Sequence, residues 1–91
     1  MTELVDRLLA HYDDLLGHRY PREHEDAWTD AADLVRADPE QGWALIVELV
    51  ERIPAAAIGY FAAGPLEDFI DFHPAFAAEH LEARISDQTI V

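Results

Sequence analysis

Apolar residues recur at the three- and four-residue spacing of an amphipathic helix over the first part of the chain. This spacing predicts a helix over residues 2–16, with Thr2 as its cap and Gly17 at its end. Acidic residues occupy positions between the apolar ones and form the expected solvent face. The apolar face consists of Leu4, Val5, Leu8, Leu9, Tyr12, Leu15 and Leu16.

A second helix is predicted over residues 23–37, after a loop that contains Pro21. Its residues expected to face the core are Ala27, Trp28, Ala31, Leu34 and Val35. Acidic residues at three- and four-residue spacing occupy the other side, so this helix is also amphipathic.

The clearest local signal is the tetrapeptide Asp38-Pro39-Glu40-Gln41. Asp38 is a favoured N-cap residue, Pro39 suits the first helical position, and Gln41 stands where a capping box is completed. The tetrapeptide therefore predicts the start of a third helix. Apolar residues from Trp43 to Ile53 cover more than half of its circumference, so we expect it to lie at the centre of the fold.

Prolines divide the rest of the chain into short segments. Breaks at Pro54, Gly64-Pro65 and His73-Pro74 predict helices over residues 55–63, 65–72 and 74–85, with Gly64 at positive φ. Residues 86–91 are predicted to form a flexible tail. The residues expected to face the core are Ile58, Phe61, Leu66, Phe69, Ile70, Phe72, Phe76, Ala77, Leu81 and Ile85.

These elements predict an all-α fold for a single domain over residues 1–91. No stretch has the alternating pattern of a strand. Five to six short helices joined by short connections indicate either a compact bundle or a short array of helical hairpins that resembles a solenoid.

The stretch from Asp38-Pro39-Glu40 through Trp43 to Gly64-Pro65-Leu66-Glu67-Asp68 resembles a family of small bacterial domains of unknown function. The resemblance covers roughly the middle and C-terminal two thirds of the chain. The segment from Gly64 to Asp68 is its most specific part. The resemblance implies a helical fold and carries over no activity.

Charge is the most distinctive property of the composition. Nineteen acidic residues face six basic ones, all of them arginine, for a formal net charge of −13. Such a chain repels nucleic acid and anionic lipid, so neither is an expected partner, whereas a basic protein is. Solubility alone accounts for this charge equally well.

Other features bear on location and chemistry. The chain has no cysteine, no signal-peptide pattern and no apolar run near the ~20 residues of a membrane helix, so a cytoplasmic protein is expected. His11 and His18 are seven residues apart, as are His73 and His80. That spacing, about 10.5 Å along a helix, is too wide for one zinc ion. We expect no metal site and no cofactor.

Catalysis is not expected either. The chain lacks lysine and a glycine-rich phosphate loop, and its one serine, Ser86, lies in the predicted tail. The best cluster for acid–base chemistry is Glu67, Asp68 and Asp71 beside His73. Acids at a helix start that interact with the helix dipole explain this cluster better.

Glu23, Asp26, Asp30 and Asp33 are predicted to form an acidic stripe on the second helix. Arg22 and Arg36 are the only basic residues near it in the sequence. The stripe is either a merely solvated face or a contact surface. Trp28 is expected in the core, whereas a partly exposed Trp28 beside this stripe would indicate a binding hot spot.

The sequence favours a small acidic protein-binding module that occludes a basic surface of a toxin, nuclease or nucleic-acid-binding protein, as an immunity protein or a nucleic-acid-mimicking inhibitor does. Its expected contact residues are Glu23, Asp26, Asp30, Asp33, Glu67, Asp68 and Asp71. An adaptor or structural domain that self-associates through residues 54–64 is the alternative. An acid–base enzyme using Glu67, Asp68 or Asp71 is the third hypothesis.

Overall fold

The computed structural model describes residues 2–18 and 24–89, and these residues form an all-α fold as predicted. A 3₁₀ turn precedes α4, and a π-helical turn joins α4 to α5 without a break. The elements are α1 (Thr2–Leu16), α2 (Glu25–Ala37), α3 (Pro39–Arg52), the 3₁₀ turn (Ala55–Ala57), α4 (Ile58–Phe61), the π turn (Ala62–Leu66), α5 (Glu67–Phe72) and α6 (Pro74–Thr89).

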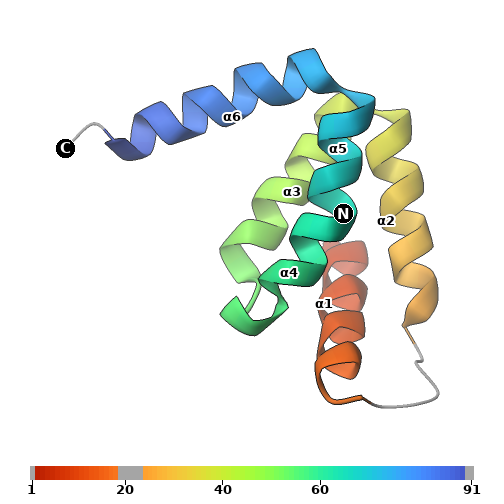
Figure 1. Ribbon diagram of the computed structural model, residues 1–91. Helices are drawn as coiled ribbons and strands as arrows, with labels where there is room; N and C mark the ends of the chain where they lie inside the picture. The colour runs from red at the N-terminus through yellow and green to blue at the C-terminus, as the bar shows by residue number, and fades with distance from the viewer. Residues whose placement is uncertain (1, 19–23, 90–91) are drawn as a thin grey trace.

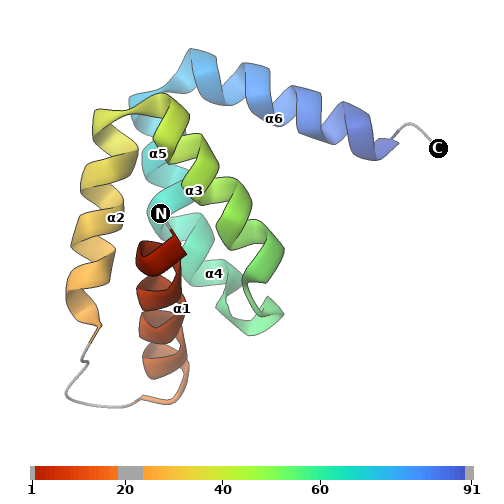
Figure 2. The ribbon, with the colours of Figure 1, turned by 180° about the vertical axis from the view of Figure 1, so that it is seen from behind.

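Helices α1, α2, α3 and the continuous segment from α4 to α5 lie side by side as a bundle, whereas α6 projects away from it (Figures 1 and 2). Helix α2 packs against α1, α3 and α5, so it contacts most of the bundle. None of the helices in the described residues is long and apolar enough to cross a membrane.

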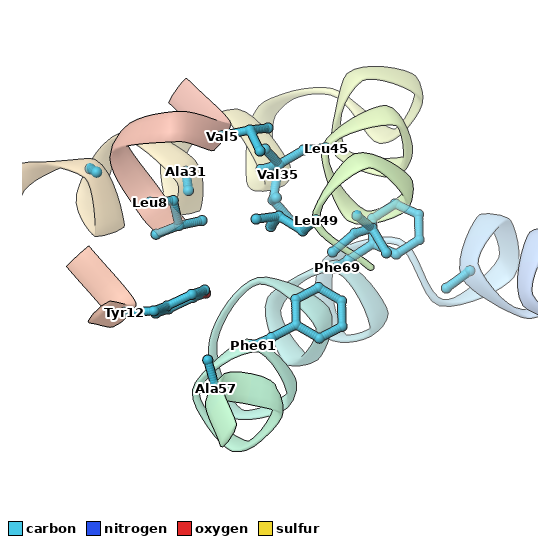
Figure 3. Packing of buried hydrophobic residues seen from close by; sticks show 13 residues of the cluster. Val5, Leu8, Tyr12, Ala31, Val35, Leu45, Leu49, Ala57, Phe61 and Phe69 are labelled. Carbon is cyan, nitrogen blue, oxygen red and sulfur yellow. The ribbon is translucent and has the colours of Figure 1, made fainter. Parts of the chain in front are cut away.

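The core lies where α1, α2, α3 and the later segments meet (Figure 3). Helices α1, α2 and α3 contribute buried side chains at the three- and four-residue spacing of a helix, and α4, α5 and α6 each add one, Phe61, Phe69 and Ala77. The largest fully buried side chains are Tyr12, Phe69, Leu8, Leu45, Leu49, Val5 and Val35.

Asp38 begins α3 as predicted. Its carboxylate Oδ1 accepts hydrogen bonds from the backbone N–H groups of Glu40 at 2.9 Å and Gln41 at 3.2 Å, and Pro39 is the first helical residue. The Asp38 N–H donates to the carbonyl oxygen of Leu34, so it is not the partner of Gln41 that a capping box requires. The same residue therefore ends α2 and begins α3, with no loop between them.

The predicted break at Gly64-Pro65 is wrong. Neither Gly64 nor any other glycine in the described part of the chain has positive φ. Gly64 and Pro65 are both buried within the π turn. Proline in an α-helix clashes with the carbonyl four residues before it. A π turn moves that carbonyl away because its hydrogen bonds span five residues. The helix therefore passes through Pro65.

The π turn also changes which side chains reach the core. An α-helix turns about 100° per residue, so the one extra residue resets the phase by about that angle. Phe61 and Phe69 would otherwise point about 80° apart, and this shift brings both into the core. Ile58, Ile70 and Phe72 were predicted to face the core, but their exposed fractions are 51%, 41% and 54%.

The break at His73-Pro74 is confirmed. His73 Nε2 donates a hydrogen bond to the carbonyl oxygen of Val35 at 2.7 Å, which ties the junction of α5 and α6 to α2. The start of α6 packs against the core through buried Ala77 and through Phe76. The Phe76 ring stacks on that of His80 in the same helix, with 3.9 Å between the ring centroids. Helix α6 then continues to Thr89, beyond the end predicted at residue 85.

Candidate functional site

Trp28 is 54% exposed, although its spacing in α2 predicted a core position. The buried residues of α2 are Ala27, Ala31 and Val35, and Trp28 follows Ala27 by one helical step of about 100°. Its indole lies against Gly64 of the π turn, where an added Cβ would be 3.5 Å from the indole nitrogen Nε1. The exposed tryptophan is therefore supported by backbone on one side and open to solvent on the other.

An aromatic cleft opens beside Trp28, between α1, α2 and the segment that contains α4 and the π turn. Its volume is about 320 Å³. Tyr12 and Tyr60 stack in its wall, with ring centroids 6.1 Å apart and planes inclined by 15°. The residues that line the aromatic cleft are His11, Tyr12, Leu15, Glu25, Trp28, Tyr60, Ala63 and Gly64.

The Tyr12 side chain extends into the core beneath this cleft (Figure 3). Its hydroxyl is buried and has no hydrogen-bond partner in the described structure. Burial also raises the pKa of the Tyr12 phenol above its usual value. This wall of the cleft is therefore uncharged at neutral pH, and Glu25 is the only acidic residue among those that line it.

A second, more polar hollow of about 260 Å³ lies on the other side of Trp28. It brings together Asp33 of α2 and Asp68 of α5, two of the predicted contact residues. Arg36 Nη2 lies 3.4 Å from the Asp68 carboxylate, and its guanidinium is 5.2 Å from the centre of the Phe72 ring. The lining residues of this polar hollow are Trp28, Thr29, Ala32, Asp33, Arg36, Ala63, Gly64 and Asp68.

The predicted acidic stripe divides into two parts. Glu23 lies outside the described residues. Nη2 of Arg7 in α1 lies 2.9 Å from the Asp30 carboxylate and 3.2 Å from that of Asp26. These two exposed carboxylates therefore form ion pairs with α1. The hydrogen bond with Asp30, followed by that with Asp26, raises the pKa of Arg7. Only Asp33 remains beside Trp28.

The cluster on α5 is also divided. Glu67 and Asp71 are exposed, and neither forms an ion pair among the described residues, whereas Asp68 is paired with Arg36. The His73 imidazole is bound through Nε2 to a backbone carbonyl. Within residues 2–18 and 24–89, no three potential metal ligands lie together.

The sequence pattern missed most of the aromatic cleft. Tyr60 stands in an apolar segment for which Ile58 and Phe61 were predicted to face the core, and no role was assigned to Tyr60. Tyr12 was placed correctly in the core, but its stacking on Tyr60 depends on the packing of α1 against a distant segment. The one usable signal was Trp28, a large aromatic next to acidic residues at the border of a predicted inner face.

Comparisons with curated proteins and with solved structures returned no match. The model of a family of unknown function, DUF6869, matches residues 17–90, which extend from the end of α1 to the end of α6. The match includes the Asp38 cap, Trp28 and the whole segment from Gly64 to Asp68. It confirms the resemblance to a small domain family of unknown function. The chain belongs to the family of unknown function DUF6869.

Proposed function

We propose that this domain is a small acidic protein-binding module whose surface around Trp28 covers a basic surface of a partner protein. The observation that carries the proposal is the half-exposed indole of Trp28 between two hollows. Tryptophan is the residue type most enriched among binding hot spots, and a pocketed position favours that role.

The charge around Trp28 supports a basic partner. Glu25 and Asp33 line the two hollows, and neither is within ion-pair distance of a described arginine or histidine. The net charge of −13 adds a long-range field that speeds encounter with a cationic surface. Toxins, nucleases and other nucleic-acid-binding proteins have such surfaces, so an inhibitor or immunity role fits best. Direct binding to nucleic acid or anionic lipid does not fit.

Self-association is the second candidate, as expected of an adaptor or structural domain. Ile58 is 51% exposed on the segment from 54 to 64, and the neighbouring Gly59 has open space around its Cα. Tyr60, Ala63 and Gly64 of the same segment line the hollows beside Trp28, whereas Ile58 lines neither of them. An acid–base enzyme has less support because Asp68 is paired with Arg36 and His73 with Val35.

The test compares capture of proteins from a cell lysate by the wild-type domain, Trp28→Ala and Ile58→Ala. Both substitutions remove an exposed apolar side chain, so the two variants are matched. The proposal expects a basic protein that the wild type and Ile58→Ala retain and Trp28→Ala loses. Loss with Ile58→Ala alone, together with a smaller oligomer in solution, would favour self-association.

Association kinetics with the purified partner then test the electrostatic part. Glu25→Gln/Asp33→Asn removes two charges near Trp28 with little change in size. We expect a slower association rate at low salt and a smaller difference above about 0.15 M, where the Debye length is about 8 Å. An association rate equal to that of the wild type at low salt would show that Glu25 and Asp33 do not contribute to the binding surface.

A further inference from the structure

The aromatic cleft has the chemistry of a receptor for a cation. Aromatic rings from α1, α2 and α4 line it, and the face of each ring carries a negative quadrupole. Glu25 is the carboxylate in its lining, and no described cation pairs with it. A cation in the cleft would therefore meet attraction from the rings and from one full negative charge.

We infer that the aromatic cleft receives the guanidinium of one arginine side chain of the partner, with Trp28 and Tyr60 as its aromatic contacts and Glu25 as its counter-ion. This inference rests on the proposed function and names the group that the partner inserts. A guanidinium is planar, stacks on aromatic rings and is less strongly hydrated than an ammonium group. It also matches the two oxygens of a carboxylate.

The size of the cleft suits one long side chain. Its volume of about 320 Å³ is near the lower end of the roughly 300–1,000 Å³ of small-ligand clefts. The described arginines are engaged elsewhere in the bundle or lie on α6. Arg7 binds Asp26 and Asp30, Arg36 binds Asp68, and Arg52 binds Asp6 at 2.6 Å.

The test uses nuclear magnetic resonance of the ¹⁵N-labelled full chain. The two tryptophans give two indole N–H signals, and Trp28→Phe identifies the one that belongs to Trp28. The probes are acetyl-Gly-Arg-Gly-amide, the same peptide with lysine, and the same peptide with citrulline, which is a neutral analogue of arginine. We expect saturable shifts of the Trp28 signal with the arginine peptide, with a Kd on the order of 1 mM.

Citrulline should bind about tenfold more weakly or worse, and lysine should fall between the two. Glu25→Gln should weaken arginine binding about threefold to tenfold and leave citrulline binding unchanged. Glu51→Gln is the matched control, because Glu51 is an exposed carboxylate of α3 outside the cleft. It should leave the arginine affinity unchanged.

Equal affinity for arginine and citrulline, or equal effects of Glu25→Gln and Glu51→Gln, would overturn the inference. The absence of a saturable shift at Trp28 would do so too. None of these results bears on whether Trp28→Ala loses the basic protein that the wild type captures from lysate. The proposed function can therefore stand when this inference fails. Loss of Trp28-dependent capture with arginine binding retained would mark the reverse case.

Arg19 and Arg22 lie outside the described residues, and Arg22 is the nearer of these two guanidinium groups to Glu25 in the sequence, which it precedes by three residues. Arg22→Gln should leave the affinity for the arginine peptide unchanged within about twofold, the range left by a screened surface charge. An increase of about tenfold or more would show that Arg22 already serves the cleft, and it would overturn the assignment of the cleft to a partner.

Discussion

The indole of Trp28 packs on Gly64, with 3.5 Å between Nε1 and the position of an added Cβ. That distance is ordinary van der Waals contact, and Gly64 lies in the π turn without positive φ. Gly64→Ala should therefore keep or raise stability by up to about 1 kcal/mol, because alanine favours helix more than glycine does. Urea denaturation measures this change, and a loss of more than about 1 kcal/mol would contradict the geometry.

A larger residue at the same position separates folding from binding. The side chain of Gly64→Leu would occupy the space of the indole, and Gly64 lines both hollows. We expect a folded variant with a displaced Trp28, which changes the tryptophan fluorescence and weakens capture of the partner. Gly64→Ala is its control, and it should retain capture.

Gly42 and Gly59 form a matched pair with opposite expectations. A Cβ on Gly42 would lie 3.3 Å from both the Val35 Cα and a ring carbon of Phe69, whereas a Cβ on Gly59 meets nothing within 4 Å. Gly42→Ala should destabilise the domain by about 1–3 kcal/mol, because the Val35 backbone cannot easily move away. Gly59→Ala should stabilise it by up to about 1 kcal/mol. Equal denaturation midpoints for the two variants would refute this contrast.

The Asp38 cap has a similarly direct test. Asp38→Ala removes the acceptor of two backbone N–H groups and should cost about 0.5–2 kcal/mol. Gln41→Ala should cost less, because the Asp38 N–H donates to Leu34 and leaves no partner for a closed capping box. Thermal and urea unfolding of both variants give the comparison, and a larger loss for Gln41→Ala would contradict the observed cap.

Local signals explain which parts of the fold could be predicted from the sequence. The helical period predicted α1 in full, and Asp38-Pro39 predicted the start of α3, because both depend on neighbouring residues only. The π turn could not be predicted, since Gly64-Pro65 is also a normal helix break and only packing against Trp28 decides between them. Ile58, Ile70 and Phe72 on either side of this turn are exposed, although they were predicted to face the core.

The candidate site was harder to predict for the same reason. The stripe on α2 was recognised from spacing, but its partner Arg7 lies on another helix, 23 residues before Asp30. Antiparallel packing of α1 and α2 brings the two together (Figures 1 and 2). The cleft beside Trp28 combines three segments that are distant in the sequence, and no spacing rule connects them.

The ion pairs of Arg7 with Asp26 and Asp30 determine the expected effect of Asp26→Asn/Asp30→Asn. Removal of like charges within one helix would raise stability slightly, but here it also removes both partners of Arg7. We expect a slightly lower denaturation midpoint at low salt and a smaller difference at high salt. Arg7→Gln should behave in the same way. A higher midpoint for the double variant would show that repulsion within the stripe outweighs the contact with α1.

Tyr12 gives the domain a dependence on alkaline pH. Burial raises the pKa of its phenol in the folded state, so the folded state holds the proton where the unfolded state begins to release it. This stabilising contribution is complete below the unfolded value of about 10 and is lost as the pH rises above it.

Tyr12→Phe should therefore lose less stability than the wild type between about pH 7 and about pH 10.5. At neutral pH it should be as stable as the wild type or more stable by about 1 kcal/mol, because it removes a buried hydroxyl with no partner. Urea denaturation at both pH values tests this. Parallel losses in the two proteins would show that other groups cause the alkaline sensitivity.

Helix α6 projects from the bundle (Figures 1 and 2), so a small change of angle at its start moves its far end a long way. With 16 residues, the helix is about 24 Å long, and its described contacts with the core come from Phe76, Ala77 and Leu81 in its first half. The hydrogen bond from His73 to Val35 lies at the junction with α5, directly before α6 begins. A rotation of about 10° at this junction would move the far end of α6 by about 4 Å, so small changes in the contacts there displace the end of the helix most.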